Sequence, residues 1–376
     1  MPVTISGSGP ITGSDRAESG VNDDITSLGA LASMNGGQLA GLRNRIINGG
    51  MDIAQRGTSF AAIASGAYSL DRWLFSNTSA AVGTVSQQPD VPSDNEFQSS
   101  LRFAVTTADA SIAAGDVALI NQYIEGYNVR DLIGRPLTLS FRVRSSKTGV
   151  HCVSFGNSNT DRTFVSEYTV NAVNTWETKT ITVSAGLITA GTWNWTNGLG
   201  LQVRFALAAG PTFQTTAGAW QTGNFLATAN QVNCLDTVGN IFAITGVQLE
   251  LGSVATPFEH RPYGMELALC QRYYLKSYNI DVAPGSALLS GVKSGVAVDT
   301  ERIFLSMCFP VSMRSTPSIT LYGENGASGV WTAIGGVNTA SASNEGISTS
   351  GFLSVTSAGL TKGNGYYGHF VASAEL

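Results

Sequence analysis

Charged side chains are scarce in this 376-residue chain. Asp, Glu, Lys and Arg make up 12% of it, about half the share found in an average soluble protein. The formal net charge is −5, and no run of basic residues occurs. Binding to nucleic acid relies on clustered Lys and Arg that neutralise phosphates, so the sequence argues against a nucleic-acid partner.

Cysteines are few and widely spaced. The four are Cys152, Cys234, Cys270 and Cys308, and no two of them form a CxxC pair. The spacing therefore predicts neither a zinc module nor a redox motif. We expect free buried thiols in a protein assembled in a reducing cytoplasm, because unpaired cysteine commonly packs as a small apolar side chain.

Long apolar runs are missing too. No stretch approaches the roughly 18 apolar residues that a membrane helix needs, and the first residues lack the charged-then-apolar order of a secretory signal. No repeat of fixed period and no long heptad series occurs. We therefore expect no membrane insertion and no extended coiled-coil shaft.

Signatures of catalysis and of metal binding are absent from the sequence. HExxH, GxSxG, P-loop and EF-hand spacings do not occur. Cleavage of a glycoside needs two carboxylates at a defined separation, which sequence spacing alone does not reveal. The carboxylates that such a pair could draw on include Asp71, Glu125, Asp131 and Glu167. We expect a protein that is not an enzyme and uses no cofactor or metal.

Glycine is abundant, with 43 residues, and the chain is also rich in Ser and Thr. This mixture is typical of all-β structure with many tight turns. Alternation of apolar and polar residues is clear at 137–144 and 199–207, and turn signals such as Gly134-Arg135-Pro136 punctuate the strands. Strands at this spacing predict a jelly-roll-like β-sandwich body over residues 43–262.

The stretch 242–274 joins this body to the rest of the chain. Residues 242–251 alternate as a strand whose phase slips at Gly246, which predicts a β-bulge. Two prolines and a glycine break regular structure over 252–262, and helical spacing returns at 265–274. We expect a last body strand that pairs near the stretch 48–73 and closes the fold, followed by a helical connector over 263–280.

Residues 281–376 form a second β-rich region. Apolar alternation at 319–322, 352–355 and 366–371 predicts strands, separated by glycine-rich loops. These features predict a smaller C-terminal β-sandwich tip. A domain of this size is marginal as an isolated core, so oligomerisation is expected.

Residues 1–42 differ from both sandwiches. The first twenty are rich in Gly, Ser, Thr and Pro, and an apolar series that includes Ile25, Leu28 and Leu31 follows Asp23 and Asp24. This pattern predicts a short helical or extended anchor, and one short helix cannot bury its apolar stripe alone. The segment is either a docking element or a disordered leader.

Three parts of the chain resemble proteins of tailed bacteriophages and prophages. They are RNRIINGGMDIAQRGTSF with YSLDRW, GVQLELGSVATPFEHRPYGMELALCQRYY, and FPVSMRSTPSITLY with GYYGHFVASAEL. The group is that of tail-fibre and receptor-binding proteins, whose matching segment is similar to carbohydrate-binding modules. The resemblance implies a homotrimer in the phage tail of the virion, assembled in the host cytoplasm. It also implies attachment to tail or adaptor proteins through the N-terminal segment, with Ile25, Leu28 and Leu31 in the attachment.

Aromatic side chains are the candidates for contact with a glycan, because sugar rings pack on flat aromatic faces. Trp193 and Trp195 would share one face of a strand beside a turn, and Trp331 lies in a glycine-rich stretch. Adjacent Tyr366 and Tyr367 would point to opposite faces of a strand, so at most one faces a core. Packing in a core or between subunits is the alternative for each of them.

These observations predict a structural virion protein: a trimeric tail fibre that binds host cell-surface polysaccharide through its distal β domains. One alternative is a head fibre or capsid decoration protein without a receptor. The other is a tail enzyme that degrades surface polysaccharide.

Overall fold

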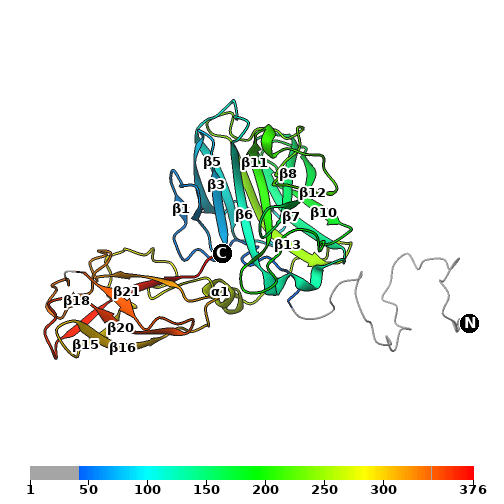
Figure 1. The fold of residues 1–376 in the computed structure, drawn as a ribbon. Coiled ribbons are helices and arrows are strands. Elements are labelled where there is room, and N and C mark those ends of the chain that lie inside the picture. The colour runs from blue at the N-terminus through cyan, green and yellow to red at the C-terminus, as the bar shows by residue number, and fades with distance from the viewer. Residues whose placement is uncertain (1–41, 340) are drawn as a thin grey trace, which may run out of the picture.

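The computed structural model describes residues 42–339 and 341–376, and nearly all of its regular structure is β (Figure 1). The predicted all-β fold class is therefore confirmed. The predicted N-terminal anchor, with Ile25, Leu28 and Leu31, lies outside the described residues. No helix among the described residues has the length and apolar character needed to cross a membrane.

Two antiparallel sheets build the body. The six-stranded sheet runs, in spatial order, β1 (Ser59–Phe60), β4 (Val82–Gln88), β5 (Ser100–Thr107), β13 (Ile241–Leu251), β7 (Leu137–Ser145) and β10 (Glu177–Val183). The seven-stranded sheet runs β12 (Trp220–Thr222), β9 (Arg162–Val170), β8 (Gly149–Asn157), β11 (Leu199–Ala209), β6 (Val117–Glu125), β3 (Trp73–Asn77) and β2 (Ala67–Tyr68). Three short 3₁₀ turns lie in the loops, at Gly126–Asn128, Arg130–Leu132 and Pro211–Phe213.

The core of the body lies between these sheets. Phe75 of β3 stacks on Phe103 of β5 with ring centroids 5.1 Å apart, and Phe141 of β7 meets Phe205 of β11 edge-on at the same distance. Each pair joins one sheet to the other, so aromatic contacts across the sandwich hold the two layers together. On β7 the buried core residues alternate with half-buried residues of the outer face from Phe141 onward, as the period of two along a strand requires.

Part of the outer face of the seven-stranded sheet is covered. The segments 211–217 and 223–228, on either side of the edge strand β12, pack on it and bury a second apolar cluster. Its members are Val117, Leu119, Cys152, Val165, Ala206, Ala209, Leu226 and Ala227. Strands β6 and β8 are consequently buried on both faces. An antiparallel strand at the surface of a sandwich more often has one face in contact with solvent.

Strand β13 lies in the middle of its sheet, between β5 and β7. The predicted bulge is present: the register shifts between Thr245 and Gln248, and Gly246 adopts φ +59°. The expectation that β13 closes the fold by pairing near 48–73 holds only in part. Its ladder partners are β5 and β7, and the amide of Val247 at the bulge donates to the Gly49 carbonyl at 3.0 Å.

A single α-helix, α1 (Tyr263–Gln271), joins the body to the tip within the described residues. It begins directly after Pro262, whose fixed φ suits the entry to a helix. The buried side of its last turn, with Cys270 and the following Tyr273, packs against Ile47 and Ile53 of the body. The helix therefore both connects the tip to the body and packs against the body.

Strand β21 (Gly365–Ser373) is the centre of the tip and pairs along both edges. One half pairs with β14 (Tyr274–Lys276) and β17 (Ser318–Tyr322), and the other with β15 (Lys293–Ala297) and β18 (Thr332–Ala333). The sheet continues from β15 through β16 (Arg302–Cys308) and β20 (Gly351–Thr356) to β19 (Ser343–Glu345). A separate apolar cluster fills this region.

The end of β21 returns to the body, where Figure 1 marks the C-terminus beside α1. The Arg72 guanidinium forms an ion pair with Glu375 and lies 3.6 Å from the centre of the Tyr273 ring. Arg272 holds Glu125 of β6 through two hydrogen bonds of 2.6 and 3.0 Å. These contacts fix the tip against the body through buried charges.

The described cysteines are all free. Cys152, Cys234 and Cys270 are buried, as expected. Cys308 is exposed, because it ends β16 just before Pro310. The expectation of buried thiols is therefore wrong at this one position.

Candidate functional site

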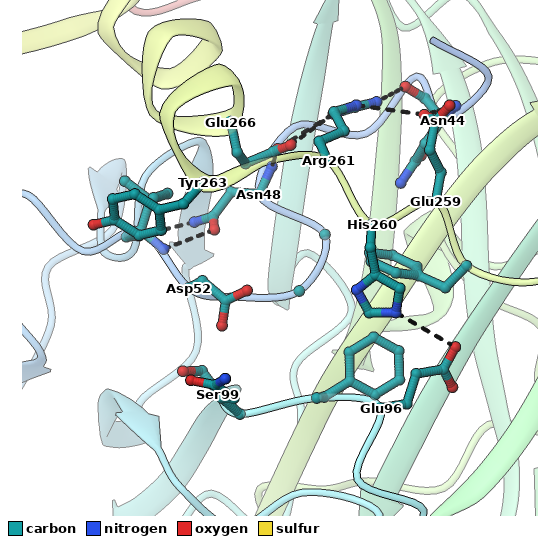
Figure 2. A pocket seen from close by; sticks show the side chains of 16 residues that line it. Asn44, Asn48, Asp52, Glu96, Ser99, Glu259, His260, Arg261, Tyr263 and Glu266 are labelled. Carbon is teal, nitrogen blue, oxygen red and sulfur yellow. Dashed lines mark hydrogen bonds and ion pairs between the residues drawn. The ribbon is translucent and has the colours of Figure 1, made fainter. Parts of the chain in front are cut away.

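A cavity of about 340 Å³ opens where the body meets α1 (Figure 2). We call it the junction pocket. Its walls are residues 44–53, residues 96–99 and residues 258–266. Three segments far apart in the sequence thus enclose one hollow, and its volume is at the lower end of the range for small-molecule sites in proteins.

Asn44 and Asn48 build the first wall by replacing backbone hydrogen bonds with side-chain ones. The Asn44 amide donates to the Val247 carbonyl at 3.0 Å, and its Oδ1 accepts from the Leu249 amide. The Asn48 side chain accepts from the Ile53 amide at 2.9 Å and donates to the Ile53 carbonyl at 2.8 Å. Buried amides used in this way hold an irregular segment rigidly.

A buried arginine fixes the opposite wall. Arg261 donates to Glu266 at 3.1 and 3.2 Å and to the Ile46 carbonyl at 3.1 Å. Glu259 accepts from the backbone amides of residues 43 and 44 at 3.0 Å each. Figure 2 shows these groups turned toward one another. Both carboxylates are thus committed to protein partners and frame the pocket.

Aromatic rings form one side of the hollow. Phe97 and Phe258 meet edge-to-face with centroids 5.1 Å apart, and His260 lies 4.9 Å from Phe258. Tyr263, the first residue of α1, stands at the rim with 53% of its surface exposed. The pocket therefore offers flat apolar faces together with an accessible phenol.

Acidic and hydroxyl groups face the remaining space. In Figure 2, Asp52 and Ser99 lie across the hollow from Glu96 and His260. Desolvation by the pocket walls raises the pKa of Asp52 although its side chain reaches solvent, and a hydrogen bond with Ser99 partly opposes this. Glu96 lies 3.8 Å from His260 and pairs with Arg142 at 2.8 Å on its other oxygen.

This combination suits a polyhydroxylated ligand. Carboxylate oxygens accept hydrogen bonds from hydroxyl groups, and charge-assisted bonds of this kind are stronger than neutral ones. Aromatic side chains can pack their flat faces on the apolar side of a sugar ring. No group of three or more His, Cys, Asp or Glu suited to hold a metal occurs among residues 42–339 and 341–376.

The predicted tryptophan pair lies elsewhere, in the loop before β11. Trp193 and Trp195 stack on each other with centroids 5.1 Å apart and planes 11° from parallel, and Trp193 meets Trp220 edge-on at 5.8 Å. All three are half-buried against the body core. The two rings lie in a loop rather than a strand, and each covers a face of the other, so less flat surface remains than a side-by-side pair would offer.

The candidates in the tip are divided between core and surface. Trp331 is fully buried, because Thr332 after it pairs with Tyr367 of β21 and draws the indole into the tip core. It therefore offers no outward contact to a glycan, and the alternative of packing in a core holds for this residue. Tyr366 is buried as well, and its hydroxyl accepts from the Thr361 amide at 2.9 Å. Tyr367 on the opposite face is half-exposed, and its role in receptor contact stays a prediction.

The carboxylates considered for catalysis are held by separate protein groups. Asp71 accepts from Gln55, Glu125 from Arg272, Asp131 from Arg45 and Glu167 from Thr228. The structure places none of the four among the residues lining the junction pocket.

Sequence reasoning missed the junction pocket because its walls are up to about two hundred residues apart in the chain. One signal was available. The stretches 43–60 and 246–274, which carry part of the resemblance to phage proteins, supply two of the three walls.

Comparison with known proteins gives no family for the chain. No protein-family model and no curated protein matches it. Solved structures of similar fold include the enzymatically active domain of tailspike protein 4 of bacteriophage CBA120. That domain is 19% identical to this chain, with a TM-score of 0.29, and the match covers 51% of this chain and 21% of that one.

Carbohydrate-binding modules also occur among the structural neighbours. The module TmCBM61, solved with β-1,4-galactotriose, is 12% identical over 56% of this chain and 99% of its own, with a TM-score of 0.29. The family 11 module of a cellulosomal cellulase of Clostridium thermocellum is 10% identical over 54% and 99%, with a TM-score of 0.28. Similarity at this level assigns no role to any residue of the chain.

Proposed function

We propose that this chain is a structural protein of a tailed-phage virion, a trimeric tail fibre that binds host surface glycan without cleaving it. The observation that carries the glycan part is the junction pocket. It joins aromatic faces to acceptor carboxylates in one rigid hollow of about 340 Å³, which is the composition expected of a sugar site.

The virion part of the proposal is supported by the sequence. Three stretches that resemble tail-fibre proteins frame most of the chain, and two of them supply two of the three walls of the junction pocket. A glycan-binding site in such a protein serves adsorption to the host, where weak single-site contacts add up across a trimer and several fibres. The N-terminal segment would attach to tail or adaptor proteins.

The proposed trimer is supported by exposed apolar side chains in the tip. Val296 and Phe304 are cross-strand partners on β15 and β16, and about half of each side chain is exposed. Apolar pairs of this kind are costly to leave in water when they gather in one patch. Sedimentation equilibrium should give the mass of three chains, and a monomer at micromolar concentration would contradict this part of the proposal.

Binding without cleavage can be tested on immobilised bacterial surface polysaccharides, including O-antigens and capsular polymers. The chain should be retained by at least one polymer, and long incubation should release no oligosaccharide. Release of oligosaccharide would replace the proposal with a degrading enzyme. Retention by none of the polymers would contradict a glycan receptor and favour a head fibre or decoration protein.

A further inference from the structure

A second hollow lies on the outer face of the seven-stranded sheet, away from the junction pocket. It measures about 210 Å³, and we call it the sheet-face pocket. Its polar lining includes Ser76, Asn121, Tyr123, Gln202, Arg204 and Asn224. It lies between this face and the covering segments 211–217 and 223–228, which line it with Phe213, Asn224 and Leu226. It opens past half-buried Tyr123, Thr160 and Asn224.

Strand register brings the polar side chains of this pocket together. Arg204 of β11 lies opposite Asn121 of β6 on one side and Ser154 of β8 on the other. Gln202 lies opposite Tyr123 in the same way. Residues two apart on a strand share a face, so all of these side chains point away from the sandwich core.

The charge of Arg204 has no counter-ion. Its side chain is 3% exposed, and in the described part of the chain no carboxylate lies within ion-pair distance of it. Burial lowers the pKa of Arg204 to about 10. Arg72, similarly buried, pairs with Glu375. A buried charge without a partner is unfavourable, so its presence beside a hollow is informative.

The hydrogen bonds of Arg204 leave donors available. Nε donates to Ser154 Oγ at 3.1 Å, Nη1 to Asn224 Oδ1 at 2.7 Å and Nη2 to the Phe225 carbonyl at 3.3 Å. A guanidinium has five N–H donors, so two are not used by these acceptors. All three acceptors are neutral, and they hold the guanidinium in place without cancelling its charge.

Two further observations indicate a built site. Asn121 is buried, its amide nitrogen donates to Ser76 Oγ at 2.9 Å, and its Oδ1 has no hydrogen-bond partner among the described residues. Gly156 of β8 lies next to Arg204, and a Cβ there would lie 2.7 Å from Nη2 of Arg204, so a side chain at this position would displace the guanidinium from its present place. The pocket thus presents cationic donors next to an unsatisfied acceptor.

We infer that the sheet-face pocket binds the anionic group of an acidic saccharide unit, with Arg204 donating to the anion and Asn121 accepting from a neighbouring hydroxyl. The anion is a carboxylate of a sugar acid or a phosphate of a polyol phosphate, because both offer paired oxygens to a guanidinium. The saccharide part of the ligand rests on the proposed function, whereas the anion site rests on the sheet-face pocket alone.

The test uses the full chain and three defined probes: trigalacturonic acid, glycerol 3-phosphate and neutral cellotriose, measured by calorimetry at two salt concentrations. At least one anionic probe should bind, more weakly at higher salt, and cellotriose should not bind at this site. Tight binding of only one anionic probe identifies the source of the anion. Absence of binding by both anionic probes at millimolar concentration would overturn the inference.

Two variants separate function from folding. Arg204→Gln should reduce anion binding at least tenfold. Asn121→Asp is nearly isosteric and gives Arg204 an internal counter-ion, so it should abolish anion binding while the melting temperature stays the same or rises. Retained anion binding in folded Asn121→Asp would overturn the assignment.

Asp52→Asn in the junction pocket is the matched control and should leave anion binding unchanged. The experiment therefore tests the junction pocket and the sheet-face pocket separately. If Asp52→Asn loses polysaccharide retention but binds the anionic probe normally, both sites are supported. If the wild-type chain retains polysaccharide but binds neither anionic probe, the proposed function stands and this inference is overturned.

Discussion

His369 lies buried in the tip with both ring nitrogens engaged. Nε2 is 2.9 Å from the Leu288 carbonyl, which can only accept, so Nε2 carries the proton. Nδ1 lies 3.0 Å from Ser277 Oγ, and the ring stacks on Tyr278 at 3.7 Å. Desolvation, opposed in part by the hydrogen bond to Leu288, lowers the pKa of His369, so the folded tip favours the neutral ring.

Stability should therefore depend on pH through this residue. Because the folded pKa of His369 is below the unfolded value of about 6.5, its contribution is complete above about pH 6.5 and is lost as pH falls toward the folded pKa. Calorimetric melts should show the tip transition moving to lower temperature between pH 7.5 and 5. His369→Asn, which does not titrate there, should lower the melting temperature at pH 7.5 and flatten the pH dependence. If the melting temperature of His369→Asn depends on pH as steeply as that of the wild type, His369 is not the group responsible.

Single residues also mark the limit of sequence reading. The burial of Trp331 follows from the pairing of Thr332 with β21, a contact that the glycine-rich sequence around it does not announce. The unpaired charge of Arg204 is equally invisible in sequence, because alternation predicts which residues face outward but not which of them meet a carboxylate.

Among the elements, β13 links the fold to the junction pocket. Its bulge places Gly246 beside Phe97, one of the aromatic walls. A Cβ at Gly246 would lie 2.4 Å from the Phe97 ring, and φ is +59°. The bulge thus allows the ring to lie against the strand and sets the shape of the pocket.

Gly246→Ala should disturb both strand and pocket. Left-handed backbone conformation costs a non-glycine residue roughly 1–2 kcal/mol, and the contact with Phe97 adds to this. Urea unfolding should show a loss of about 1–3 kcal/mol, accompanied by weaker polysaccharide retention. Gly115→Ala is the control, since a Cβ there meets open space. Equal stability of the two variants would show that the bulge tolerates a side chain.

Alternation in the sequence revealed the strands that carry polar side chains on one face, whether that face meets solvent or is covered. Strands β11 and β13 were predicted in this way, although both faces of each are buried. Strands β7 and β10, at the end of the six-stranded sheet, show clear alternation in their burial. Strand β6 was not predicted, because apolar Val117 and Leu119 lie on its covered face and remove part of the polar half of the pattern. The junction pocket was not predicted either, because its walls come together only through tertiary contacts.

At the scale of the whole molecule, buried ion pairs hold the tip to the body. Glu375 pairs with Arg72 and, at 2.9 Å, with Arg56. The two guanidinium groups each lie 3.6 Å from a tyrosine ring centre, Arg56 over Tyr274 and Arg72 over Tyr273. Glu375 near the C-terminus is therefore joined to the body by two cations, each of which also packs on a tyrosine of the stretch that follows α1.

Arg72→Ala should therefore destabilise the protein strongly. Removing one partner of a buried pair costs roughly 3–5 kcal/mol, and we expect the lower end because Arg56 still neutralises Glu375. Chemical unfolding monitored by fluorescence would measure it. Arg302→Ala removes an exposed pair with Glu345 and should cost at most about 1 kcal/mol. Equal losses in the two variants would mean that the contact between body and tip adds little to stability.

The central claim is that the junction pocket is the glycan site, and one comparison tests it most directly. Polysaccharide retention by wild type is measured beside Asp52→Asn, Tyr263→Ala and the control Tyr127→Ala, whose exposed tyrosine lies outside the junction pocket. Loss of a charge-assisted bond or of the aromatic rim should weaken apparent affinity about tenfold or more in the first two variants, with Tyr127→Ala like wild type. Unchanged retention in folded Asp52→Asn and Tyr263→Ala would contradict the claim.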